Sequence, residues 1–92
     1  MTELTIQSRI LDHLRKTYPL CICWKIEDAK LSGIPDIYFA YDGISIWFEV
    51  KSKTGTTSPI QKYTIMSLER NKILVYVVKS LSDTKKILSN IF

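Results

Sequence analysis

The sequence predicts one α/β domain over residues 1–92, in which helices flank a mixed sheet in the order αβββαβα. Three observations predict it. The length of 92 residues fits a single domain, and a hydrophobic content of 46% excludes a disordered chain. An Asp-Gly pair at 42–43 separates two apolar segments, as in a β-hairpin. Farther along, a helical segment precedes an unbroken apolar run, which is typical of a helical crossover between parallel strands.

The first half of the chain is expected to form a helix and three strands. The helix covers residues 4–16, where Thr2 is a suitable N-cap and the apolar side chains recur at helical spacing: Ile6, Ile10, Leu11 and Leu14. It ends at Tyr18-Pro19, because proline disfavours the helical conformation of the residue before it. The strands are expected at residues 20–26, 36–41 and 44–51. The Asp-Gly turn makes the second and third strands antiparallel.

The second half is expected to form a helix, a strand and a final helix. Ser58 is the N-cap of the first of these helices, proline follows at its first position, and Gln61 completes a capping box. The helix runs to about Arg70, and Asn71 suits the left-handed position after it. Residues 73–78 form an apolar run typical of a strand covered on both faces and parallel to the third strand. The last helix starts at Ser80 or Ser82 and reaches about residue 90.

Charge and cysteine content restrict the partners and the compartment. The net charge is +4, from 13 basic and 9 acidic residues, which suits a nucleic acid partner but is common among proteins without one. Cys21 and Cys23 lack the spacing of a zinc knuckle, so we interpret both as buried strand residues in a reducing compartment. No apolar run approaches the length of a membrane span, and no signal peptide is evident. We therefore expect a cytoplasmic protein without a membrane partner.

The third strand carries the first candidates for chemistry. Glu49 and Lys51 share one of its faces, because side chains alternate along a strand. Alone, such a pair is more typical of a solvated charged face. The Asp-Gly turn changes this interpretation, because it places Asp36 opposite Glu49. Two facing carboxylates repel each other, whereas a divalent cation such as Mg²⁺ between them removes the cost. Lys51 would then hold a water molecule or stabilise developing phosphate charge.

Other polar residues have both a structural and a functional interpretation. Glu3 and Gln7 lie on the apolar side of the first helix, where a polar side chain needs a partner unless this first turn is solvated. Gln61 either serves only the capping box or faces the metal site. Trp47 shares the face of Glu49 but is expected to pack under the first helix. Four lysines are candidates for phosphate contacts, although each alone is typical of ordinary surface: Lys25, Lys30, Lys53 and Lys62.

These motifs resemble the virus-type replication-repair nuclease (VRR-NUC) family of the PD-(D/E)XK nuclease superfamily. The resemblance spans Glu3 to about Val78 and rests on four pieces in order: a glutamate on the first helix, Gly33-Ile34-Pro35-Asp36, Glu49-Val50-Lys51, and the glutamine of Ser58-Pro59-Ile60-Gln61. Each piece is weak alone, but the four together at this spacing are specific. One departure is the neutral pair Thr56-Thr57, where relatives often have a basic residue that grips the substrate.

The resemblance implies a restriction-endonuclease-like sandwich and a metal-dependent phosphodiesterase that acts on DNA. Asp36, Glu49 and the Val50 carbonyl would bind Mg²⁺ or Mn²⁺, and Lys51 would position or activate water. Gln61 and Glu3 would support the site. Stand-alone members of this size resemble phage or bacterial homodimers that cut branched DNA such as four-way (Holliday) junctions. Two alternatives stay open: a non-catalytic DNA-binding module with this fold, and a restriction-type endonuclease acting on plain duplex.

Overall fold

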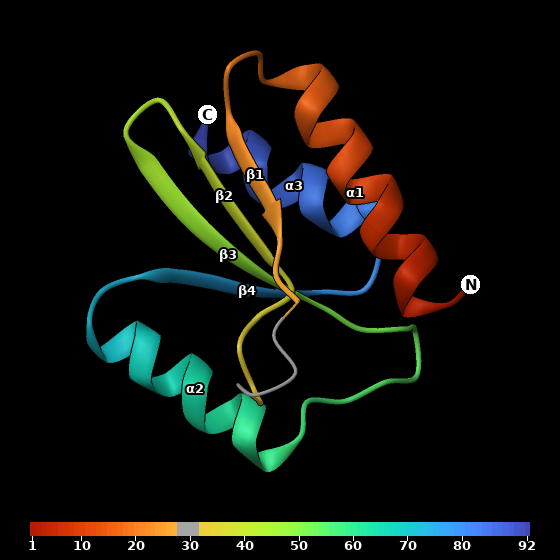
Figure 1. Cartoon of the computed structure of the whole chain (residues 1–92), viewed down its shortest axis with the longest axis vertical. Helices are drawn as coiled ribbons and strands as arrows, with labels where there is room; N and C mark the ends of the chain where they lie inside the picture. Colours follow the sequence, from red (N-terminus) through yellow and green to blue (C-terminus); the bar gives the residue numbers. More distant parts are fainter. Residues whose placement is uncertain (28–31) are drawn as a thin grey trace.

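A four-stranded mixed sheet with three helices around it forms the structure, a computed structural model that describes residues 1–27 and 32–92 (Figure 1). The elements along the chain are α1 (Glu3–Thr17), β1 (Ile22–Lys25), β2 (Ile37–Tyr41), β3 (Ile44–Val50), α2 (Pro59–Arg70), β4 (Leu74–Val78) and α3 (Leu81–Ile91). The predicted order αβββαβα is therefore confirmed. No helix in the described ranges is long and apolar enough to cross a membrane.

The sheet has the spatial order β1-β2-β3-β4 and contains both kinds of strand pairing. The first three strands are antiparallel, and β4 runs parallel to β3 after the crossover through α2. Asp42 and Gly43 both have positive φ, at 50° and 77°, as a two-residue hairpin turn requires. The turn pairs Tyr41 with Ile44. This is the register expected from the sequence, and it brings the start of β2 beside the end of β3.

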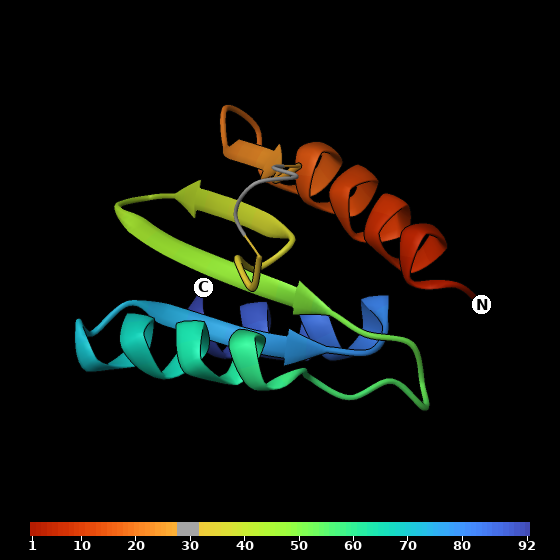
Figure 2. The same cartoon turned by 60° about the horizontal axis from the view of Figure 1, so that its bottom comes forward.

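The hydrophobic core lies between the sheet and the helices α1 and α3. Figure 2 shows the arrangement of the sheet and its helices from a second direction. The side chains on α1 that were expected to face the interior are all buried. They pack with apolar residues from one face of the sheet and from α3: Ile37, Phe39, Ile46, Phe48, Val50, Val78 and Leu88. The other face of β3 carries Trp47, Glu49 and Lys51, and α2 lies on that side beside β4 (Figure 1).

Several boundaries differ from the prediction. The first strand is shorter than residues 20–26, because Leu20 has a φ of 65° and is fully exposed in the turn after α1. Asp36 precedes β2 instead of opening it. Lys72, with a φ of 60°, takes the left-handed position predicted for Asn71, whose φ is −90°. The serine cap of the last helix is Ser80, whose hydroxyl accepts a hydrogen bond from the Asp83 N–H at 3.0 Å.

Two predictions about packing are wrong. The β4 strand is an edge of the sheet, so Leu74 and Val77 stay 38% and 44% exposed although the run is apolar throughout. Trp47 does not pack under α1, because it lies on the opposite face of the sheet from the core. Its ring contacts Tyr38 with centroids 5.0 Å apart. The cysteine prediction is half right: both thiols are free, Cys23 is buried in β1, and Cys21 lies before β1 and is only half-buried.

Candidate active site

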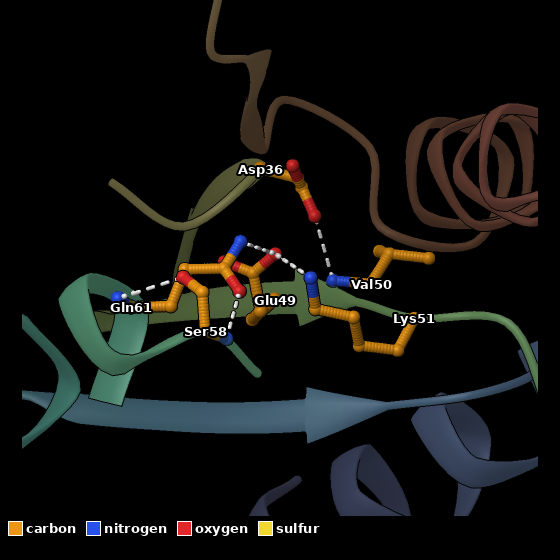
Figure 3. A network of polar contacts seen from close by, with 6 residues as sticks. All are labelled: Asp36, Glu49, Val50, Lys51, Ser58 and Gln61. Carbon is orange, nitrogen blue, oxygen red and sulfur yellow. Dashed lines mark hydrogen bonds and ion pairs between the residues drawn. The ribbon is translucent and has the colours of Figure 1, made fainter. Parts of the chain in front are cut away.

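Asp36 and Glu49 meet where β2 begins and β3 ends (Figure 3). The Val50 backbone N–H donates to Asp36 Oδ2 at 2.7 Å, which fixes one carboxylate oxygen against β3. The chain before β2 is also tied down, because the Ile26 N–H donates to the Asp36 carbonyl at 2.8 Å. One residue earlier in β3, the Glu49 side chain projects on the α2 side of the sheet. The hairpin register therefore brings together the two carboxyl groups that the sequence paired.

The Glu49 carboxyl is buried in an environment that disfavours its charge. The residue is 1% exposed, and Oε2 has no hydrogen-bond partner among the described residues. Burial is the largest cause that raises the pKa of Glu49, from its ordinary 4.5 to about 8. Hydrogen bonding and repulsion from Asp36 raise it further, the Lys51 ammonium opposes the shift, and the charge of Glu3 adds to it. Without another cation, the site holds this carboxyl protonated near neutral pH.

Lys51 and Gln61 converge on the same oxygen of Glu49. Lys51 is buried, and its Nζ lies 3.9 Å from Glu49 Oε1. Gln61 Nε2 donates to that oxygen at 3.4 Å. The other end of the Gln61 amide accepts from the Ser58 N–H at 2.9 Å, and the Gln61 N–H donates to Ser58 Oγ at 3.3 Å. The two interpretations of Gln61 are thus compatible, because one amide completes the capping box and contacts Glu49 (Figure 3).

The segment before Asp36 packs directly on the first turn of α2. Gly33 has a φ of 84°, and a Cβ built there would lie 2.9 Å from the Ile60 carbonyl oxygen and 3.0 Å from Thr64 Oγ1. Only glycine combines this conformation with so close an approach. Pro35 follows, fully buried. The Gly33 contact therefore sets the spacing between Asp36 on one segment and Gln61 on the other.

The α1 helix faces the same region from the other side. Thr2 caps it as predicted, accepting from the Thr5 N–H at 3.2 Å, so the first turn is regular. Glu3 is half-buried and close enough to influence the pKa of Glu49. Gln7 is 7% exposed, and its Oε1 has no hydrogen-bond partner in the described chain. A buried amide oxygen without a partner is costly, so a partner outside the described protein atoms is expected at this position.

The residues present fit a divalent cation such as Mg²⁺. Asp36 and Glu49 supply carboxylate oxygens, and Oε2 of Glu49 is buried without a partner. A bound dication would favour the charged form of Glu49, whose pKa is raised without it. The described residues contain no cluster of three or more His, Cys, Asp or Glu side chains. Such a small ligand set suits Mg²⁺, which keeps several waters and binds through one or two carboxylates. The contact of Val50 with Asp36 uses its N–H, and the role predicted for its carbonyl stays a prediction.

The basic residues predicted to contact phosphate are in different surroundings. Lys25 pairs with Glu27, with Nζ and Oε1 3.0 Å apart. Lys62 is exposed on α2. Lys53 lies in the loop after β3, two residues beyond Lys51, and lines a cavity together with Arg9. Lys30 lies outside the described residues. Arg9 and Lys79, which also lines that cavity, were not predicted from the sequence, because no local motif connects these positions.

Comparisons with known proteins were made by sequence and by structure. No family model matches the chain, and no curated protein matches it. A solved structure described as a VRR_NUC domain is similar to it, with a TM-score of 0.76 and 19% sequence identity. The likeness covers 94% of this chain and 97% of that one. The chain therefore has the nuclease-type fold of a VRR-NUC domain, and the resemblance seen in its motifs is confirmed at the level of the fold.

Proposed function

We propose that this protein is an endonuclease that hydrolyses DNA phosphodiester bonds with Mg²⁺ or Mn²⁺, selects branched DNA such as four-way junctions, and acts as a homodimer. One observation carries the proposal. Glu49 is buried beside Asp36, Lys51 and Gln61 with a carboxylate oxygen that has no partner among the described residues. Burial of one carboxyl group beside a second one is costly in a site with no cation to bind.

Each residue of the site has a distinct task in this proposal. Asp36 and Glu49 would hold the metal ion, with the Val50 carbonyl completing its inner ligands. The ion would polarise the scissile phosphate and lower the pKa of a water molecule. Lys51 would orient that water and stabilise charge on the phosphate. Gln61 keeps the Glu49 carboxylate in position through Oε1, and Glu3 supports the site from α1.

Selectivity for DNA shape follows from the small size of the domain. A chain of 92 residues offers little surface for reading base edges, so recognition through phosphates and shape is favoured. Lys25, Lys30, Lys53 and Lys62 would contribute contacts to the backbone. Such an enzyme would act in the cytoplasm of a bacterium or of a phage-infected host cell, where its DNA substrate lies.

The exposed apolar side chains support a homodimer. Ile60, Tyr63 and Met66 recur every three residues along one side of α2 and are 50%, 66% and 52% exposed. Trp24 on β1 is 58% exposed. Large exposed apolar side chains in a small domain are typical of an interaction surface. Sedimentation equilibrium of wild type and Tyr63→Glu tests this: we expect a dimer that the variant weakens, whereas a wild-type monomer contradicts it.

Cleavage of a substrate panel tests the activity. The panel contains a four-way junction, a flap and a linear duplex, each with Mg²⁺, Mn²⁺ or a chelator. We expect metal-dependent cleavage that favours the junction. Equal cleavage of all three would contradict the selectivity, sequence-dependent cuts in duplex would indicate a restriction-type enzyme, and binding without cleavage would indicate a DNA-binding module.

Substitutions in the site test the assignments. Asp36→Asn and Lys51→Met should abolish cleavage while the protein stays folded. Asp12→Asn and Lys86→Met are matched controls, because they remove an exposed carboxylate from α1 and an exposed ammonium from α3. Full activity of Asp36→Asn would overturn the metal assignment.

A further inference from the structure

A cavity of about 360 Å³ lies between the first turns of α1 and α3 and the loop after β3. Three basic side chains line it, each from a different segment: Arg9 from α1, Lys53 from the loop after β3, and Lys79 from the connection between β4 and α3. Ile6 and Leu81 form part of its apolar lining, and Ser82 adds a hydroxyl. No Asp or Glu is among the described residues that line it.

The three cations have no acidic partner in the described structure. The ion pairs found there are Lys25–Glu27 and Lys51–Glu49, neither of which involves this cavity. Lys79 Nζ donates to the Lys53 carbonyl at 3.3 Å, which holds the two segments together without neutralising either charge. Asp83 follows Lys79 by four residues, and its carboxylate accepts from the Lys79 N–H at 2.9 Å but does not line the cavity. Three positive charges around one cavity favour an anion inside it.

The cavity is next to the candidate active site. Lys53 follows Lys51 by two residues, and two residues of extended chain span at most about 7 Å. Arg9 belongs to the same helix as Glu3, whose charge acts on the Glu49 carboxyl. If one phosphate of a DNA strand lies at Glu49, a neighbouring phosphate of the same strand therefore comes close to the cavity.

We propose that the cavity formed by Arg9, Lys53 and Lys79 is a second phosphate-binding site, which holds a phosphate of the strand being cut. This inference rests on the proposed nuclease function. It assigns to Arg9 and Lys79 a role in binding DNA and gives Lys53 a specific place in that contact. The phosphate is either internal to the strand or at its 5′ end, and both carry the negative charge that the cavity favours.

DNA binding without cleavage tests the inference. Fluorescence anisotropy with a labelled four-way junction and a short single strand, in the presence of a chelator, gives the affinity at several salt concentrations. The Arg9→Gln/Lys79→Gln variant should bind about tenfold or more weakly and should reduce the salt dependence by between one and two units of the logarithmic slope. The matched control is Lys16→Gln/Lys86→Gln, which removes one exposed charge from α1 and one from α3, at residues that do not line the cavity. We expect it to bind as wild type does.

Single strands with and without a 5′-phosphate distinguish the two sources. If the cavity holds a terminal phosphate, wild type binds the phosphorylated strand more tightly, and the Arg9→Gln/Lys79→Gln variant loses this preference. If it holds an internal phosphate, wild type binds both strands equally and the variant weakens both. Equal binding by this variant and its control on every DNA would overturn the inference.

Failure of the phosphate site and failure of the nuclease function give different results. Wild type that binds DNA through the cavity but does not cleave with Mg²⁺ or Mn²⁺ would contradict the proposed function and keep the phosphate site. Wild type that cleaves, with a cavity variant that binds normally, would contradict the phosphate site alone. Urea unfolding compares the stability of both double variants with that of wild type. Because the four side chains are exposed, we expect similar stabilities, so that a loss of binding comes from the lost charges.

Discussion

Replacing Gly33 by alanine tests whether the contact between the segment before β2 and α2 positions the site. Gly33 and Gly43 have similar positive φ values, 84° and 77°, so alanine pays the left-handed penalty of about 1 kcal/mol at both positions. Only at Gly33 does the new Cβ meet backbone, 2.9 Å from the Ile60 carbonyl oxygen, whereas nothing lies within 4 Å at Gly43. Overpacking of this kind costs a further 1–3 kcal/mol, roughly.

We therefore expect Gly33→Ala to lower the free energy of unfolding by about 2–4 kcal/mol and Gly43→Ala by about 1 kcal/mol. Urea unfolding monitored by circular dichroism measures both. Because the contact sets the distance between Asp36 and Gln61, Gly33→Ala should also reduce cleavage by about 100-fold, as a misplacement near 1 Å does. Gly43→Ala, in the distant hairpin turn, should cleave normally. Equal destabilisation by the two substitutions would refute this reasoning.

The remaining predictions concern Glu49 and its neighbours. In chelator, burial raises the pKa of Glu49 in the folded protein to about 8, whereas in the unfolded chain the pKa is the ordinary 4.5. Between these two pH values the folded protein therefore binds a proton that the unfolded chain has released. The contribution of Glu49 to the free energy of unfolding should therefore be complete below pH 4.5 and fall as pH rises toward 8, by at most about 1.4 kcal/mol per pH unit. Urea midpoints should show this fall in wild type and Asp12→Asn but not in Glu49→Gln. Mg²⁺ or Mn²⁺ at 100 times its dissociation constant should stabilise wild type by about 2.7 kcal/mol in thermal unfolding, and an equal gain in Glu49→Gln would contradict the assigned ligand. Ser58→Ala should cost about 1 kcal/mol through loss of the cap yet keep most cleavage, whereas Gln61→Ala should lose the cap contact and most cleavage; similar rates for the two variants would show that Gln61 only caps α2.

Local signals in the sequence predicted the elements and most of the candidate site. Helical periodicity and the caps at Thr2 and Ser58 located α1 and α2, because these signals depend on neighbouring residues. The Asp-Gly turn fixed the hairpin register, and strand alternation then placed Asp36 near Glu49 on the same side as Lys51. The capping role of Gln61 was visible in the local sequence, whereas its place at the metal site was implied mainly by the resemblance to the VRR-NUC family.

Features that depend on distant contacts were not predictable in this way. The exposure of β4 depends on its place at the edge of the sheet, which its apolar sequence does not reveal. Trp47 was expected under α1, whereas it contacts Tyr38 on the opposite face. The end of α2 was also missed although it is a local feature: Lys72 instead of Asn71 takes the left-handed position, because helix ends depend on local hydrogen bonds as well as on residue preference.

The sequence by itself determined the order of the elements, the β2–β3 register and the candidate residues Asp36, Glu49, Lys51 and Gln61, because spacing and turn chemistry are local properties of the chain. Only the tertiary structure decided how deeply Glu49 is buried, that its Oε2 has no partner among the described residues, and that Arg9, Lys53 and Lys79 surround one cavity. Burial and charge convergence depend on side chains from segments far apart in the sequence, and folding alone brings these together.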